Sequence, residues 1–168
     1  MSKYRYAAYG SNLHPLRLQK RVPTARLLGT STLSGYELRF NKKSDVDGSG
    51  KCSINIAKGV VYVAVFEISN TEKPDLDRIE GLGKGYRQQS IQLEEYGDCL
   101  TYVADPMAID ETILPMDWYK EMVLLGCISN RFPKDYVSYI ETVGSVQDSK
   151  MKRARANWKI IEELRNDT

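Results

Sequence analysis

The sequence has 168 residues, of which 42% are hydrophobic and 27% are charged. This balance is typical of a soluble globular chain and excludes a fibrous or extensively disordered one. The 24 lysines and arginines nearly balance the 22 aspartates and glutamates and leave a formal charge of +2, so net charge does not indicate nucleic acid or an anionic membrane as a partner.

The first predicted elements are a strand, a tight turn and a short helix. Residues 4–9 are aromatic and apolar, which favours a strand, and the Gly-Ser-Asn of residues 10–12 follows as a turn signal. Pro15 is favoured in the first turn of a helix, which we expect to continue to residue 22. Strand, glycine turn and helix together form a geometry that can receive an anion.

The middle of the sequence predicts three strands and a loop. Residues 25–40 alternate short apolar and polar stretches, broken by Gly29 and Gly35, which indicates two strands. Residues 45–51 read DVDGSGK and have the composition of a loop. Residues 60–68 are almost wholly apolar on both alternating faces, so we expect a central strand buried from both sides.

The rest of the sequence predicts one helix, a hairpin and then helices only. The helices are expected at residues 71–80, 118–125, 133–143 and about 150–165, and the hairpin strands at residues 88–93 and 100–103. The docking face of the last helix should comprise Met151, Ala154, Trp158, Ile161 and Leu164. Strands followed by helices are typical of an α+β fold. Without repeats or linkers, we expect one domain over residues 1–168.

The histidine and cysteine content excludes several chemistries. His14 is the only histidine, and Cys52, Cys99 and Cys127 are widely spaced, so no zinc site is expected. Three cysteines cannot all pair within the chain, and together with the lack of a secretory signal this favours the reducing cytoplasm. No apolar run approaches the roughly 20 residues needed to cross a bilayer. We therefore expect a cytoplasmic protein without a metal centre or a membrane segment.

The turn at residues 10–12 is the first candidate site. A sharp bend from strand to helix exposes successive backbone N–H groups, which can hold an anion or a developing oxyanion. Gly10 allows a ligand close to the backbone, and Ser11 and Asn12 add polar side chains. The alternative is an ordinary turn in which Ser11 or Asn12 caps the following helix.

Glu80 is the second candidate. If Gly81 ends the helix, Glu80 lies in its last turn, where the helix dipole disfavours an ionised carboxylate by roughly 0.3–1 kcal/mol. Glycines at positions 81, 83 and 85 would leave the carboxylate open to a cleft, where it could serve as a general base. The alternative is an exposed surface glutamate at a helix end.

A basic run near the end of the sequence is a weaker signal. It consists of Lys150, Lys152, Arg153, Arg155 and Lys159, with no acidic residue between them. We interpret it as the solvated face of an amphipathic helix. Nucleic-acid binding is the less favoured alternative, because interleaved aromatic residues beyond Trp158 are missing.

Four short motifs follow one another along the sequence. They are Tyr-Gly-Ser-Asn-Leu at residues 9–13, Leu-Asp-x-x-Glu-Gly at residues 76–81, Gly-Tyr at residues 85–86, and Pro-x-x-Trp-Tyr at residues 115–119. In this order and spacing, the sequence resembles the γ-glutamylcyclotransferase-like family, which includes AIG2-like proteins. The resemblance covers roughly residues 4–143, and the C-terminal helix lies outside it.

The resemblance implies a fold, a reaction and a site. The implied fold is a small mixed β-barrel with flanking helices, whose cavity holds the turn against Glu80. Members of the family cyclise a γ-glutamyl group to 5-oxoproline and release an amine, an amino acid or a peptide, and we expect no cofactor. Glu80 matches the catalytic acid/base, and the implied substrate-binding positions are Tyr9, Gly10, Ser11, Asn12, Leu13, Tyr86 and Tyr119.

The expected partner is therefore a small γ-glutamyl molecule rather than nucleic acid or a membrane, bound by a monomer or homodimer. Membership of a family does not guarantee activity. The alternative function is a non-catalytic small-molecule binding module of the same fold.

Overall fold

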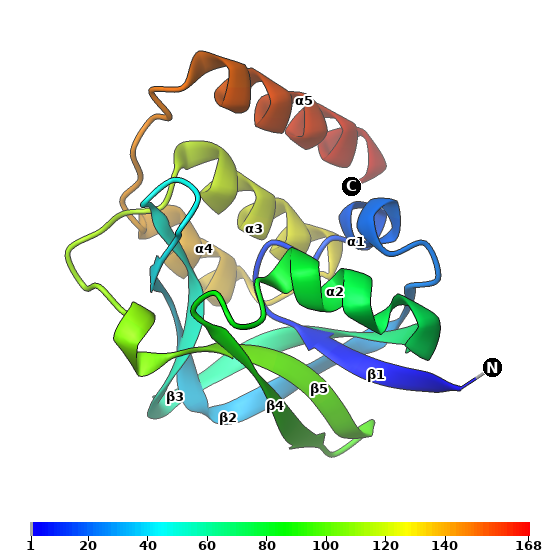
Figure 1. The fold of residues 1–168 in the computed structure, drawn as a ribbon. Helices are drawn as coiled ribbons and strands as arrows, with labels where there is room; N and C mark the ends of the chain where they lie inside the picture. The colour runs from blue at the N-terminus through cyan, green and yellow to red at the C-terminus, as the bar shows by residue number, and fades with distance from the viewer. Residues whose placement is uncertain (1) are drawn as a thin grey trace.

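The computed structural model describes residues 2–168 and shows a mixed five-stranded sheet with five α-helices gathered on one side of it (Figure 1). The strand order is β2-β3-β1-β5-β4, with β1 at Lys3–Ala8, β2 at Arg26–Lys43, β3 at Gly50–Ser69, β4 at Tyr86–Leu93 and β5 at Gly97–Ala104. The helices are α1 (Pro15–Arg21), α2 (Lys73–Glu80), α3 (Asp117–Ser129), α4 (Lys134–Thr142) and α5 (Met151–Asp167). The predicted α+β class is confirmed.

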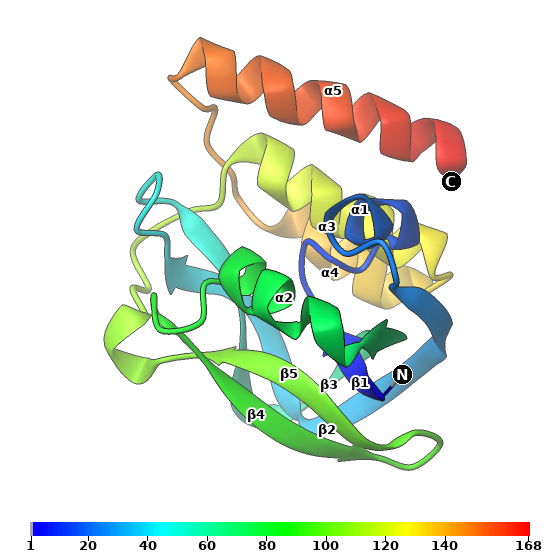
Figure 2. The same ribbon diagram turned by 45° about the vertical axis from the view of Figure 1, so that its right-hand side comes forward.

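The sheet is curved but does not close into the small barrel that the family resemblance implied. Strands β2 and β4 are its two edges, and no hydrogen-bonded ladder joins them within residues 2–168. A barrel closes only when its first and last strands pair along a tilted register, whereas β4 pairs with β5 alone. The barrel is thus corrected to an open mixed sheet, whose long β2–β3 hairpin curls up toward the helices (Figure 2).

The β2–β3 hairpin is longer than the sequence predicted. Residues 25–40 were expected to form two strands, but residues 26–40 lie in the single strand β2, which shifts register against β3 near Gly29 and Gly35. Glycine in a strand can form a bulge as readily as a turn, so the chain bends here without ending the strand. Strand β3 begins at Gly50 rather than at residue 60, so the predicted loop is shortened by its last two residues.

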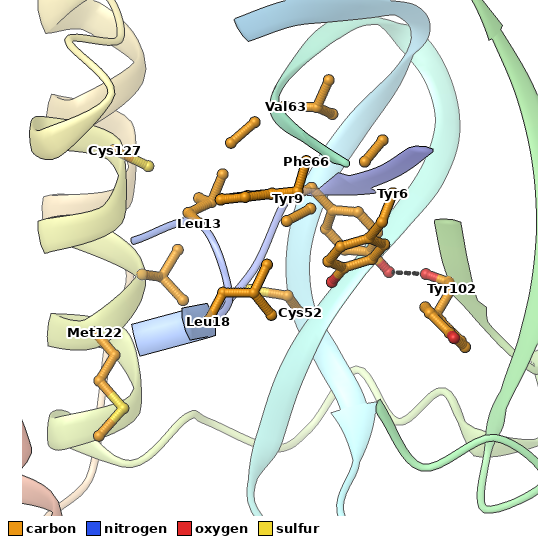
Figure 3. Close-up of a cluster of buried hydrophobic side chains, with 14 of the residues drawn as sticks. Tyr6, Tyr9, Leu13, Leu18, Cys52, Val63, Phe66, Tyr102, Met122 and Cys127 are labelled. Carbon is orange, nitrogen blue, oxygen red and sulfur yellow. Dashed lines mark hydrogen bonds between the residues drawn. The ribbon is translucent and has the colours of Figure 1, made fainter. Parts of the chain in front are cut away.

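Strand β1 is the middle strand of the sheet, with β3 antiparallel on one side and β5 parallel on the other. Residues 60–68, which were predicted to be central, lie in β3 and are interior but adjacent to the middle. The end of β1 directs residues 9–13 into the layer between the sheet and the helices. Buried side chains surround this turn, including Tyr6, Leu13, Leu18, Phe66, Met122 and Cys127 (Figure 3).

Helix α5 packs over α3 (Figure 1) and is fastened at its start by a buried carboxylate. Asp148 accepts hydrogen bonds from the Trp118 indole at 3.0 Å and from Arg153 at 2.6 Å. Ile161 and Leu164 are fully buried, but Met151, which was predicted to dock, is 64% exposed. Met151 is the first residue of α5. Within residues 2–168, no helix is long and apolar enough to cross a membrane.

Candidate active site

The turn after β1 leaves three successive backbone donors unused. The Leu13 N–H donates to the Gly10 carbonyl at 3.1 Å and closes the turn. The N–H groups of Gly10, Ser11 and Asn12 donate to no acceptor within residues 2–168. The N-cap residue of helix α1 is His14, whose side chain forms no capping hydrogen bond. Neither Ser11 nor Asn12 therefore caps this helix. The geometry therefore favours the anion-binding interpretation over the ordinary capped turn.

Helix α3 fixes this turn from behind. The side-chain amide of Asn130 donates to the Leu13 carbonyl at 2.8 Å. A Cβ atom on Gly126 would lie 2.5 Å from the Leu13 Cβ and 3.1 Å from the His14 nitrogen, so only glycine permits this approach. Leu13 is fully buried and does not line the cavity. Its side chain anchors the turn rather than facing a ligand.

Glu80 lies at the end of α2 and faces the turn. Gly81 follows in the left-handed region with φ of 72° and ends the helix. Glu80 Oε1 accepts a hydrogen bond from Asn12 Nδ2 at 2.6 Å and a short one from the Tyr6 hydroxyl. Both bonds fall on Oε1, so Oε2 receives no donor from residues 2–168 and remains free for a ligand. The alternative of an exposed surface glutamate is therefore wrong.

Arg21 determines which way the Asn12 amide points. Its Nη1 donates to Asn12 Oδ1 at 2.7 Å, so the Nδ2 group must face Glu80. Asn12 is 3% exposed, and a buried amide holds its orientation when both ends are hydrogen-bonded. The three residues form one continuous chain from guanidinium to amide to carboxylate.

The three tyrosines that were predicted to bind substrate line another part of the site. Tyr86 donates to the Cys52 carbonyl at 2.6 Å, and the Cys52 N–H donates to the Tyr119 hydroxyl at 3.1 Å. Tyr9 donates to the Tyr102 carbonyl at 2.5 Å (Figure 3). The Tyr119 hydroxyl accepts in its bond to the Cys52 N–H and carries a proton of its own. Burial raises the pKa of Tyr119 well above its ordinary value, which keeps this proton in place at neutral pH.

These residues enclose one narrow cavity of about 30 Å³. The predicted residues that line it are Tyr9, Gly10, Ser11, Asn12, Glu80, Tyr86 and Tyr119, joined by Tyr6, Cys52, Thr101 and Tyr102. This volume matches roughly one water molecule. A ligand larger than this is therefore only partly enclosed by these residues. No group of three His, Cys, Asp or Glu residues among residues 2–168 could hold a metal ion.

Comparison with known proteins gives consistent matches. The model of the AIG2-like family matches residues 60–140, a stretch that contains Glu80, Tyr86 and Tyr119. The γ-glutamylcyclotransferases of Bos taurus and Homo sapiens are 26% identical over 146 and 148 residues, covering 82% of this chain and 77% of each relative. A solved structure of a γ-glutamyl cyclotransferase shares the fold with a TM-score of 0.82 at 22% identity, covering 96% of this chain and 99% of that one. These matches support the resemblance of the chain to the γ-glutamylcyclotransferase-like family.

The site also contains residues that the sequence patterns did not predict. Tyr6 could have been noticed, because it alternates with Tyr4 along the first strand. Arg21 gives no such signal, since a basic residue in the last turn of a short helix is common. The contact joins Asn12, which precedes α1, to Arg21 at the end of α1, so it depends on how the turn is placed relative to the helix.

Two lysines that contact the site tyrosines, Lys42 buried and Lys51 partly buried, were also unexpected. Lys42 and Lys51 pair across β2 and β3. The Lys42 ammonium lies 4.7 Å from the centre of the Tyr86 ring, and the Lys51 ammonium lies 4.6 Å from that of Tyr119. Cation–π contacts of this kind hold the two rings against the hairpin. Lysine usually indicates solvent exposure, so the sequence pattern points away from this role.

Proposed function

We propose that this protein is a γ-glutamyl cyclotransferase that converts a γ-glutamyl amine, amino acid or peptide into 5-oxoproline and the free amine. The observation that carries the proposal is the placement of Glu80: one carboxylate oxygen is held by two donors, and the other is free beside three unused backbone N–H groups. The names of the relatives from Bos taurus and Homo sapiens support the same reaction.

The reaction joins two groups of one substrate molecule. The α-nitrogen of the glutamyl group attacks its own γ-carbonyl carbon, and the bond from that carbon to the departing nitrogen then breaks. Holding the chain in a folded conformer converts the attack into an intramolecular step, so no nucleophilic side chain is required.

Glu80 would manage the protons of this reaction. The α-ammonium group must lose a proton before it can attack, and the departing nitrogen must gain one before it can leave. Glu80 Oε2 can take a proton from the attacking nitrogen and deliver it to the departing nitrogen, while the second ammonium proton goes to solvent. The N–H groups of residues 10–12 and the Tyr119 hydroxyl are available to stabilise an anionic oxygen.

The test is a turnover assay with matched variants. γ-Glutamyl amino acids, γ-glutamyl amines and glutathione are offered to the purified protein, and 5-oxoproline is measured. Glu80→Gln should lower kcat by roughly 10²–10⁴-fold without changing the fold. The control is Glu141→Gln, which alters an exposed glutamate near the end of α4 and should turn over at the wild-type rate.

Each outcome decides a separate part of the proposal. Full activity of Glu80→Gln contradicts the mechanism, and no 5-oxoproline from any wild-type reaction contradicts the function. Binding of 5-oxoproline without turnover would instead favour the non-catalytic binding module. We expect the reaction in the cytoplasm, where the three free, buried cysteines would stay reduced. A monomeric or homodimeric state remains a prediction.

A further inference from the structure

One buried lysine on β2 contacts the segment that separates two predicted site residues. Lys42 is 4% exposed, and its ammonium donates a hydrogen bond to the Lys84 carbonyl at 2.9 Å. The same ammonium lies 4.7 Å from the centre of the Tyr86 ring. Both contacts fall on the chain that follows Glu80. The 81–85 loop joins α2, which ends at Glu80, to β4, which begins at Tyr86.

The 81–85 loop has little conformational preference of its own. Three of its five residues are glycines, with φ of 72°, 76° and 88°, in the left-handed region that glycine enters without steric cost. Glycine also loses more conformational freedom on folding than any other residue, so this loop depends on outside contacts to keep one conformation. Two such contacts come from distant strands: Asp105, just after β5, donates its N–H to the Gly85 carbonyl at 2.9 Å, and Lys42 donates to the Lys84 carbonyl.

The Lys42 side chain packs directly against the loop backbone. A Cβ atom on Gly85 would lie 2.7 Å from Lys42 Cε and 3.0 Å from Lys42 Nζ. The same atom would lie 3.0 Å from the Ala108 Cβ. The loop at Gly85 is therefore enclosed between the lysine on β2 and the segment that follows β5.

Burial of the Lys42 ammonium is unfavourable in itself. Among residues 2–168 it forms no ion pair with a carboxylate, whereas the ammonium of its cross-strand neighbour Lys51 lies 2.9 Å from Asp47. Burial lowers the pKa of Lys42, and Asp45 opposes this shift. One hydrogen bond and one cation–π contact offset only part of the cost of a buried charge. Because no opposite charge would be left unpaired without Lys42, the stability of the fold gives no reason for a lysine here.

We propose that Lys42 is a positioning residue that holds the 81–85 loop, so that Glu80 at one end of the loop and Tyr86 at the other both face the cavity. Glu80 and Tyr86 line the cavity and Lys42 does not, so Lys42 acts through them. A displacement of about 1 Å at a reacting group can lower the rate roughly 100-fold. This inference rests on the proposed function and adds a residue outside the cavity on which the rate depends.

The experiment measures amide hydrogen exchange and turnover on the same variants. Lys42→Met keeps an unbranched apolar stem but neither donates to Lys84 nor carries a charge. The control is Lys43→Met, because Lys43 is the next residue of β2, is exposed, and forms no side-chain hydrogen bond or ion pair in the described chain. The N–H groups of residues 81–84 all donate to backbone carbonyls, so their exchange, followed by mass spectrometry, reports opening of the loop. Release of 5-oxoproline gives kcat and KM.

A hydrogen bond from a charged donor corresponds to roughly 10- to 100-fold in an equilibrium constant. Lys42→Met should therefore speed exchange of the loop amides by about this factor and leave exchange in β1 and β3 unchanged. We expect kcat to fall roughly 10- to 100-fold, with little change in KM because Lys42 touches no substrate. Tm should shift by less than about 4 °C. Lys43→Met should match the wild type in every measurement.

Loop exchange at the wild-type rate in Lys42→Met would overturn the inference, and so would faster loop exchange with a wild-type kcat. If Lys42→Met fails to fold, or loses far more than about 4 °C in Tm with faster exchange throughout the sheet, Lys42 supports the whole fold and the inference is likewise overturned. A wild type that releases no 5-oxoproline refutes the proposed function, and loop exchange then still decides whether Lys42 holds the loop.

Discussion

Replacing Arg21 with methionine should slow turnover by acting on Glu80 through Asn12. Arg21 Nη1 lies 2.7 Å from Asn12 Oδ1, and Asn12 Nδ2 lies 2.6 Å from Glu80 Oε1. Methionine fills much of the same space but donates no hydrogen bond, so the Asn12 amide can turn its oxygen toward Glu80. A hydrogen bond from a charged donor contributes about 1.5–3 kcal/mol. This range corresponds to a decrease in kcat of roughly 10- to 100-fold, with little change in KM because Arg21 touches no substrate.

A double-mutant cycle tests this chain of contacts. Initial rates of 5-oxoproline release are measured for Arg21→Met, Asn12→Ala and the double variant. Because both changes break one chain, the double variant should be scarcely slower than Asn12→Ala alone. Arg26→Met serves as the control, since Arg26 forms an exposed ion pair with Glu67. Losses that simply multiply in the double variant, or a wild-type kcat for Arg21→Met, would refute the reasoning.

Two further predictions concern the elements that support the site. Gly126→Ala would place a Cβ atom 2.5 Å from that of Leu13. We therefore expect the free energy of unfolding to fall by about 1–3 kcal/mol and turnover to slow. An unchanged Tm and kcat would contradict this prediction. Hydrogen bonding to Arg153 lowers the pKa of Asp148 below the usual 3.8. The ionised Asp148 carboxylate therefore stabilises the fold above that pH, and this stabilisation is lost below it. Tm should fall more steeply with acid in the wild type than in Asp148→Asn. Parallel curves of Tm against pH for the two proteins would contradict this prediction.

The local parts of the site could be predicted from the sequence. The turn of residues 10–12 and the helix ending at Glu80 depend on glycine, proline and apolar spacing, which act over a few residues. The family resemblance brought these two segments together before any coordinates did. Each segment alone allowed an ordinary explanation, either a capped turn or an exposed glutamate. Only their hydrogen bond, between Asn12 and Glu80, excludes both.

The remaining features depend on contacts between distant segments. Gly29 and Gly35 could either end a strand or bend it. The continuous pairing of β2 with β3 shows that the strand bends at these glycines and does not end. Strand register likewise decides whether the two edge strands of the sheet pair with each other, and the sequence pattern does not specify this register. Arg21 and Lys42 were not predicted because charged residues usually indicate solvent exposure. Their burial follows from the crowding of α1 and of the hairpin around the cavity.

The buried contact between Asp148 and the Trp118 indole gives the molecule an internal reporter. Trp118 and Trp158 are the only tryptophans of the sequence; the first lies beneath the segment that leads into α5, and the second lies on α5 itself. Fluorescence emission will therefore follow detachment of the terminal helix, whereas far-ultraviolet circular dichroism follows all the secondary structure. If helix α5 separates before the sheet unfolds, the fluorescence transition will occur at a lower temperature than the circular-dichroism transition.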